Sequence, residues 1–105
     1  MRALLMPLLW LVFSVPVGHA AEHFVTQKNN HFSTKMLKIK AGDTVIFKND
    51  DAHYHNVFSL TEGQDFDLGS YGQGQIKKRK FEKPGKVEVE CAIHPDMKLI
   101  IEVSK

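Results

Sequence analysis

The sequence is poor in cysteine: Cys91 is the single cysteine in 105 residues, so no disulfide can form within the chain. It has no internal repeat, no low-complexity segment and no stretch with the apolar period of an amphipathic helix. The formal net charge is only +2, which is far from the basic excess typical of nucleic-acid-binding domains. These absences leave a small single domain, built without disulfides and without recognisable helices, as the interpretation of the chain.

Residues 1–20 resemble an export signal. Arg2 is their only charged residue, an apolar run follows it, and the segment ends at Ala20 in the small-x-small pattern of a cleavage site. Cleavage there would leave residues 21–105 as the mature domain. The alternative is an uncleaved membrane anchor, because the uncharged stretch is just long enough to span a bilayer. Pro16, two residues before Gly18 of this pattern, favours cleavage.

Export makes the lone cysteine informative. An exported domain enters an oxidising compartment, where small domains usually gain disulfides. A single thiol is prone to oxidation there unless it is buried or bound to a metal. Cys91 is therefore a candidate metal ligand on these grounds alone.

Cys91 begins the segment CAIHPDM, which has the spacing Cys-x-x-His-x-x-Met and ends at Met97. A thiolate, an imidazole and a thioether are soft or borderline ligands, a set that suits copper. Before the segment, Val87, Val89 and Cys91 alternate with glutamates. After it, apolar residues again share one parity: Met97, Leu99, Ile101 and Val103. We therefore expect two half-buried strands, with Cys91 and Met97 facing the same core and the loop between them closing around a metal.

Other strands are predicted from alternating apolar residues, at 24–27, 37–39, 44–48, 53–58 and 76–81. The basic run Lys77–Lys80 makes the last of these an expected edge strand, and a docking patch for an acidic partner is the alternative. Segment 61–75 is rich in glycine and polar residues, and we expect a long loop there, pinned by Phe66 and Leu68. Pro84-Gly85 is typical of a type II turn.

The metal site needs one more ligand, and the residues offer two candidates for it. His53 and His55 share one parity with Val57, so either could face the metal, or both could lie on the surface at a strand end. His23 and His31 are farther from the C-terminal loop in sequence, and we interpret them as exposed histidines.

The segments HNVF at 55–58 and CAIHPDM at 91–97, between short strands and behind a signal peptide, resemble the cupredoxins, the small blue-copper proteins. The short C-terminal loop is most similar to the amicyanin and plastocyanin-like branch. The resemblance covers essentially all of residues 21–105. It implies an all-β fold, a Greek-key β-sandwich of about seven to eight short strands.

By position, the resemblance implies that His55, Cys91, His94 and Met97 bind one mononuclear type I copper ion. The set would be a trigonal His₂Cys group with a long axial bond to Met97. His55 is preferred to His53 because Asn56 follows it, as an asparagine does in the family. The resemblance also implies that Asn56 braces the two ligand segments and that His94 is the electron port at the surface.

Three positions depart from the family's pattern without removing a ligand. Tyr54 and Ile93 stand where proline is common, and Ala92 stands where serine or threonine is common. Unlike proline, Ile93 has an N–H. We expect this group to donate a second hydrogen bond to the Cys91 sulfur, beside one from the Asn56 backbone, and so to raise the reduction potential.

The resemblance implies a periplasmic, monomeric protein that carries single electrons by Cu(I)/Cu(II) cycling and is not an enzyme. Its partners would be redox proteins such as a c-type cytochrome or a periplasmic dehydrogenase or oxidase, with no nucleic acid and no stable membrane insertion after signal cleavage. The alternative is a copper carrier or copper-homeostasis protein that moves metal instead of electrons, weakly supported by the additional histidines. A metal-free interaction module is a third alternative, disfavoured by the four ligands.

Overall fold

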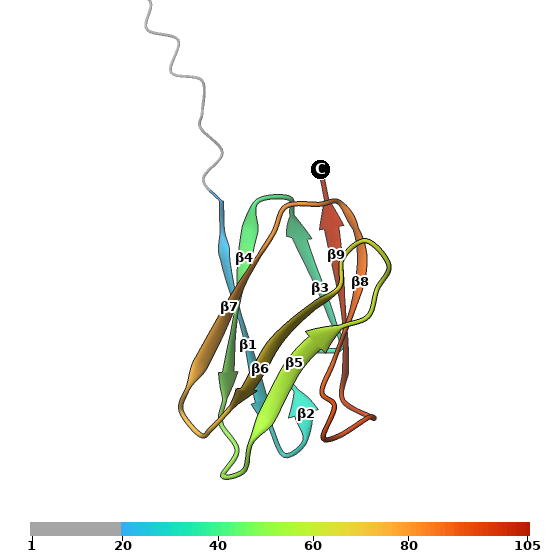
Figure 1. Ribbon diagram of the computed structural model, residues 1–105. Coiled ribbons are helices and arrows are strands. Elements are labelled where there is room, and N and C mark those ends of the chain that lie inside the picture. Colours follow the sequence, from blue (N-terminus) through green and yellow to red (C-terminus); the bar gives the residue numbers. More distant parts are fainter. Residues whose placement is uncertain (1–19) are drawn as a thin grey trace, which may run out of the picture.

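The computed structural model describes residues 20–105, which form two packed β-sheets (Figure 1). The first sheet has the order β2-β1-β4-β7. Its strands are β1 (Glu22–Lys28), β2 (His31–Phe32), β4 (Asp43–Asn49) and β7 (Ile76–Phe81). The second has the order β3-β9-β8-β5-β6. Its strands are β3 (Met36–Lys40), β5 (His55–Ser59), β6 (Phe66–Tyr71), β8 (Gly85–Glu90) and β9 (Lys98–Ser104).

The strand directions are mixed within each sheet. β1 runs parallel to β4, and β3 runs parallel to β9, while the other paired strands are antiparallel. The predicted all-β sandwich is confirmed, with nine strands in the described residues. The predicted signal peptide lies outside the described residues except for Ala20. Within residues 20–105, no helix has the length and apolar character needed to cross a bilayer.

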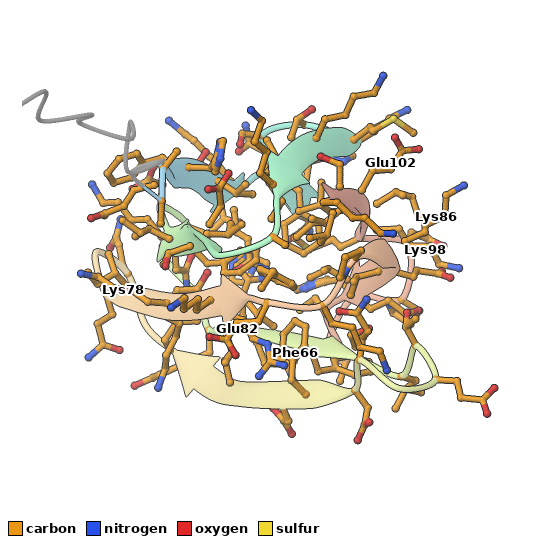
Figure 2. The ribbon with its side chains drawn as sticks, turned by 90° about the horizontal axis from the view of Figure 1, so that it is seen from above. Phe66, Lys78, Glu82, Lys86, Lys98 and Glu102 are labelled. Atoms are coloured by element: carbon orange, nitrogen blue, oxygen red, sulfur yellow. The ribbon has the colours of Figure 1, made fainter. Side chains whose placement is uncertain are left out.

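The core forms where the inward-facing side chains of the two sheets meet. Val45 and Phe47 of β4 are fully buried, as are Val87 and Val89 of β8 and Leu99 of β9. In β8 and β9 the buried residues alternate with exposed or half-exposed ones, as expected when one face of a strand is buried. In β4, Ile46 between Val45 and Phe47 is also buried. In the view down the sandwich, Lys78, Lys86 and Lys98 lie at its periphery (Figure 2).

The prediction of a long loop at 61–75 is wrong for the middle of this segment, because residues 66–71 form the edge strand β6. The pairing of β6 with β5 shifts register between Asn56 and Phe58, and Gly69 has a φ of +79°. Such a bulge places one extra residue in a strand, so side chains on its two sides change parity. Phe66 and Leu68 pack against the core, as predicted, and Tyr71 is buried despite its opposite parity.

β7 is an edge strand, as the basic run predicted. The run is not uniformly solvated, however. The Arg79 guanidinium lies over the Phe66 ring, 4.5 Å from its centroid, and 5.8 Å from that of Phe81. The expected type II turn is not formed: the chain bends at Lys83, and Gly85 already begins β8 with a φ of +140°.

Three connections meet at the end of the sandwich opposite the C-terminus: β1–β2, β4–β5 and β8–β9 (Figure 1). The β1–β2 connection is a turn at Asn29 and Asn30, and both residues adopt positive φ angles, 53° and 59°. Asparagine tolerates this left-handed conformation better than most residues. The predicted copper ligands lie in the β8–β9 connection or, for His55, directly after the β4–β5 connection, so the fold brings them to this end.

Asp43 lies near the opposite end and ties the start of β1 to the β3–β4 turn. Its carboxylate accepts hydrogen bonds from the Lys40 N–H at 3.0 Å, the His23 Nε2 at 2.9 Å and the Ala21 N–H at 2.9 Å. These bonds, led by that from Lys40, lower the pKa of Asp43 to about 2.

The stability of the protein in acid tests the role of the hydrogen bonds that the Asp43 carboxylate accepts. A carboxyl group that titrates near 3.8 when unfolded and near 2 when folded stabilises the fold fully above the higher value. This stabilisation is lost as the pH falls through the lower value. We expect Asp43→Asn to be less stable at neutral pH and to lose less stability than the parent between pH 4 and pH 2. Urea unfolding of the metal-free proteins measures both effects, and parallel pH profiles would contradict this assignment.

Candidate metal centre

The four predicted ligands lie at the positions that their strands dictate. His55 is the first residue of β5 and is fully buried. Cys91 directly follows β8 and Met97 directly precedes β9, and both belong to the buried core. His94 lies between them in residues 91–97, which we call the ligand loop, and is partly buried. The expectation that Cys91 and Met97 face the same core is confirmed.

His55 presents one ring nitrogen to Cys91 and the other to a carboxylate. Its Nδ1 lies 3.6 Å from the Cys91 Sγ, and its Nε2 lies 2.6 Å from the Asp51 Oδ2. An ionised carboxylate can only accept a hydrogen bond, so Nε2 carries the proton and Nδ1 has the free lone pair. A histidine that binds a metal is usually oriented in this way by an acceptor on its other nitrogen.

Asp51 is a part of the site that sequence reasoning missed. It is buried, and besides His55 it receives the backbone N–H groups of Asn29 at 2.7 Å and Asn30 at 3.2 Å. Burial alone would raise the pKa of Asp51, but the hydrogen bonds from His55 and from the two N–H groups outweigh it and hold the pKa at about 2. The carboxylate therefore stays ionised behind His55. The signal available in the sequence was that an acidic residue, Asp51, precedes the candidate ligand His55 by four residues.

His94 carries a buried nitrogen that has no partner in the protein. Its Nδ1 is shielded from solvent and makes no hydrogen bond. The backbone of the ligand loop is nevertheless ordered by its own bonds, from the His94 N–H to the Cys91 carbonyl at 3.2 Å and from the Met97 N–H to the His94 carbonyl at 2.9 Å. Buried polar atoms without partners are rare, and an absent ion is one explanation of them.

Asn56 connects the two ligand segments, as predicted. Its N–H lies 3.5 Å from the Cys91 Sγ, and its Oδ1 accepts the Ala92 N–H at 2.7 Å. Its carbonyl in turn accepts the Gln27 side-chain amide at 3.2 Å, and the Tyr71 hydroxyl donates to Gln27. Gln27 and Tyr71 are buried, and burial raises the pKa of Tyr71 well above its ordinary value. A buried polar chain thus fixes Asn56 from the interior.

The expected second hydrogen bond to the thiolate is not formed. Among the described residues, the backbone donor to the Cys91 sulfur is Asn56, and Ile93 is not a donor to it. The turn of the ligand loop instead uses the His94 N–H, which bonds to the Cys91 carbonyl. Ile93 has half of its surface exposed, so its contribution is to the outer surface of the site.

The donor atoms at this end of the sandwich fit copper. His55 and His94 offer imidazole nitrogens, Cys91 a thiol and Met97 a thioether. The Nδ1 of His94 is buried and has no partner in the protein. Nitrogen and soft sulfur ligands together select copper over hard cations.

Comparison with known proteins identifies the family. Residues 20–104 match the family model of copper-binding proteins of the plastocyanin/azurin family. The chain belongs to this family. A relative in Methylorubrum extorquens, the methylamine utilization protein MauL, is 28% identical over 106 residues, covering 99% of this chain and 93% of MauL.

Solved cupredoxin structures have the same fold. A reduced amicyanin variant has a TM-score of 0.72 at 25% identity, covering 77% of this chain and 80% of the amicyanin chain. A copper-containing nitrite reductase from Thermus scotoductus has a TM-score of 0.74 at 30% identity. The match covers 80% of this chain but only 22% of that enzyme. The predicted cupredoxin resemblance, on the amicyanin-like branch, is confirmed.

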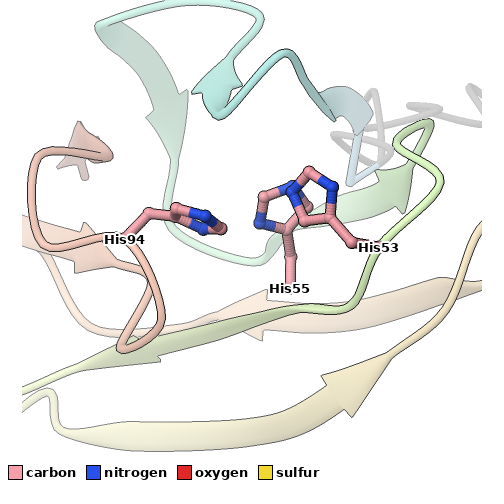
Figure 3. Close-up of side chains that lie close together, drawn as sticks. All are labelled: His53, His55 and His94. Atoms are coloured by element: carbon pink, nitrogen blue, oxygen red, sulfur yellow. The ribbon is translucent and has the colours of Figure 1, made fainter.

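The cupredoxin site of this chain contains an additional histidine. His53 was the lower-ranked alternative to His55, yet its ring centroid lies 4.7 Å from that of His55 and 5.3 Å from that of His94. The three side chains point toward one another (Figure 3). His23 is bonded to Asp43 near the opposite end, and His31 is exposed on β2. The proximity of His53 could not be read from the sequence, because parity alone does not separate it from His55.

Proposed function

We propose that the protein is an exported type I copper protein that carries single electrons between redox proteins. Its ligands are His55, Cys91, His94 and Met97. The observation that carries the proposal is the orientation of His55, whose Nδ1 faces the Cys91 sulfur at 3.6 Å while Asp51 holds its other nitrogen. The unpartnered Nδ1 of His94 supplies the second imidazole.

When bound, copper would supply a one-electron couple between Cu(I) and Cu(II). The chain's own contribution is to hold nitrogen and sulfur donors in an arrangement that both states tolerate. His55 begins strand β5 and Cys91 directly follows strand β8, and Asn56 joins the segments that carry them. Because these groups are already held by hydrogen bonds and burial, little of the protein needs to rearrange when an electron is gained or lost.

Electrons would enter and leave beside His94. Its neighbour Ile93 is a large apolar residue that is 50% exposed. We expect redox partners such as a c-type cytochrome or a periplasmic dehydrogenase or oxidase to contact this surface, with the protein acting as a periplasmic monomer. The relative MauL is named for methylamine utilization, which supports a dehydrogenase among the partners.

The proposal treats the protein as a carrier and not as an enzyme. Met97 is 2% exposed and directly precedes β9, an interior strand of its sheet, so it would close the side of the site that a substrate would need. The nitrite reductase match covers only a fraction of that enzyme and supports the shared fold.

Copper addition tests the proposal directly. We expect the metal-free protein to bind one Cu(II) per chain, to develop an intense blue thiolate-to-copper band and to show a reversible one-electron potential. Zn(II) addition is the control, because it fills the site without the colour. A colourless Cu(II) complex that a chelator strips easily would contradict electron transfer and favour the copper carrier.

A further inference from the structure

We propose that His53 completes a three-imidazole site with His55 and His94, which binds a borderline divalent cation, Cu(II) or Zn(II), without the Cys91 thiolate. The proposal shares His55 and His94 with the proposed copper function but does not need the thiolate bond on which that function rests. It assigns to His53 a role that the type I ligand set leaves out.

The three side chains already gather as a metal site requires. Each offers one ligand nitrogen, and these nitrogens all lie within 4.8 Å of one another. The rings are separated by 4.7–5.3 Å between centroids and are tilted by 56–58°, so they converge instead of stacking face to face (Figure 3). Bonds of about 2.0–2.1 Å to one ion would draw the nitrogens closer than this. The His53 side chain is 51% exposed, so it is less confined by packing than the fully buried His55.

His53 has the hydrogen bond that metal-binding histidines characteristically make. Its Nε2 lies 2.8 Å from the Asn30 Oδ1, which can only accept, so Nε2 carries the proton and Nδ1 has the lone pair. The same reasoning holds for His55 on Asp51. The Nδ1 of His94 has no partner in the protein, so each of the three imidazoles has a nitrogen available for a metal.

Charge and access favour a cation at this position. The Asp51 Oδ2 lies 3.8 Å from the His53 Nε2, so an ionised carboxylate stands behind two of the three imidazoles. Cys91 is only 1% exposed, whereas His53 lies on the outer side of the centre. An ion arriving from solvent therefore meets imidazoles first. Imidazole suits both Cu(II) and Zn(II).

The test separates the imidazoles from the thiolate. In a Cys91→Ser protein we expect Cu(II) to bind in a colourless complex whose electron paramagnetic resonance spectrum shows coupling to three nitrogens. Adding His53→Ala should weaken Cu(II) and Zn(II) binding at least about tenfold, because losing a ligand should cost no less than losing one of its outer partners. It should also reduce the coupling to two nitrogens. The matched control is His31→Ala in the same background, which removes an exposed histidine outside the cluster.

Equal affinities and equal nitrogen coupling with and without His53 would overturn the proposal. If serine at position 91 prevents folding, as circular dichroism would reveal, the same comparison is made with Cys91→Ala. The proposed electron-transfer function is tested separately, by the presence or absence of the blue band in the protein that retains Cys91. A protein without that band but with His53-dependent binding would keep the three-imidazole site and lose the type I site.

Discussion

Cys91→Ser is expected to abolish the blue thiolate-to-copper absorption and the reversible potential completely. The colour of a type I centre arises from a Cu(II)–thiolate bond, and Cys91 is the only cysteine in the chain. No other thiol can replace it. The substitution is nearly isosteric in a position that is 1% exposed, so the strands on both sides of the ligand loop should remain folded.

Met97→Leu is the matched comparison, because it changes another proposed ligand of the same loop at a buried position and keeps the volume and apolar character. We expect this variant to keep the blue band and to shift its potential, since the axial ligand tunes the potential of such sites. Absorption spectra and voltammetry of the copper-loaded proteins distinguish the two variants. A blue band that survives Cys91→Ser would overturn the type I assignment altogether.

The orientation of Cys91 and Met97 in the ligand loop could be predicted because it depends on the residues next to them in the sequence. Alternation on both sides fixes the parity of Cys91 and Met97, and parity decides which face of a strand is buried. Strand β6 was missed for the complementary reason. The bulge at Gly69 interrupts the alternation that would have revealed a strand, and its effect on parity appears only when the partner strand β5 is present.

The surroundings of the ligands could be predicted only in part. Asn56 follows its ligand directly and was identified. Asp51 and His53 act through contacts with the Asn29-Asn30 turn, more than twenty residues away in the chain. The positive φ angles of this turn direct its N–H groups toward Asp51, an arrangement that depends on tertiary folding. Long-range partners of this kind leave no periodic signal in the sequence.

Asp51→Ala should damage both the fold and the metal centre. It would leave the buried Nε2 of His55 without an acceptor and would free the N–H groups of Asn29 and Asn30. The two turn residues are exposed, so water can replace part of what they lose, whereas His55 is 0% exposed. We expect the metal-free protein to lose about 2–4 kcal/mol of unfolding free energy, most of it from the unsatisfied imidazole.

The same substitution should weaken Cu(II) and Zn(II) binding about 10–100-fold, because His55 would no longer be held with its proton on Nε2 and its lone pair toward Cys91. Asp50→Ala is the control, since it removes the same charge from the adjacent residue, which pairs with Lys48 at 3.5 Å. Asp51→Asn should fall between the two, because an amide retains one accepting oxygen. Urea unfolding and competitive metal titration give both quantities. If Asp51→Ala and Asp50→Ala behaved alike in both, the carboxylate behind His55 would have only a general electrostatic effect, and the orientation of this ligand would have to come from burial alone.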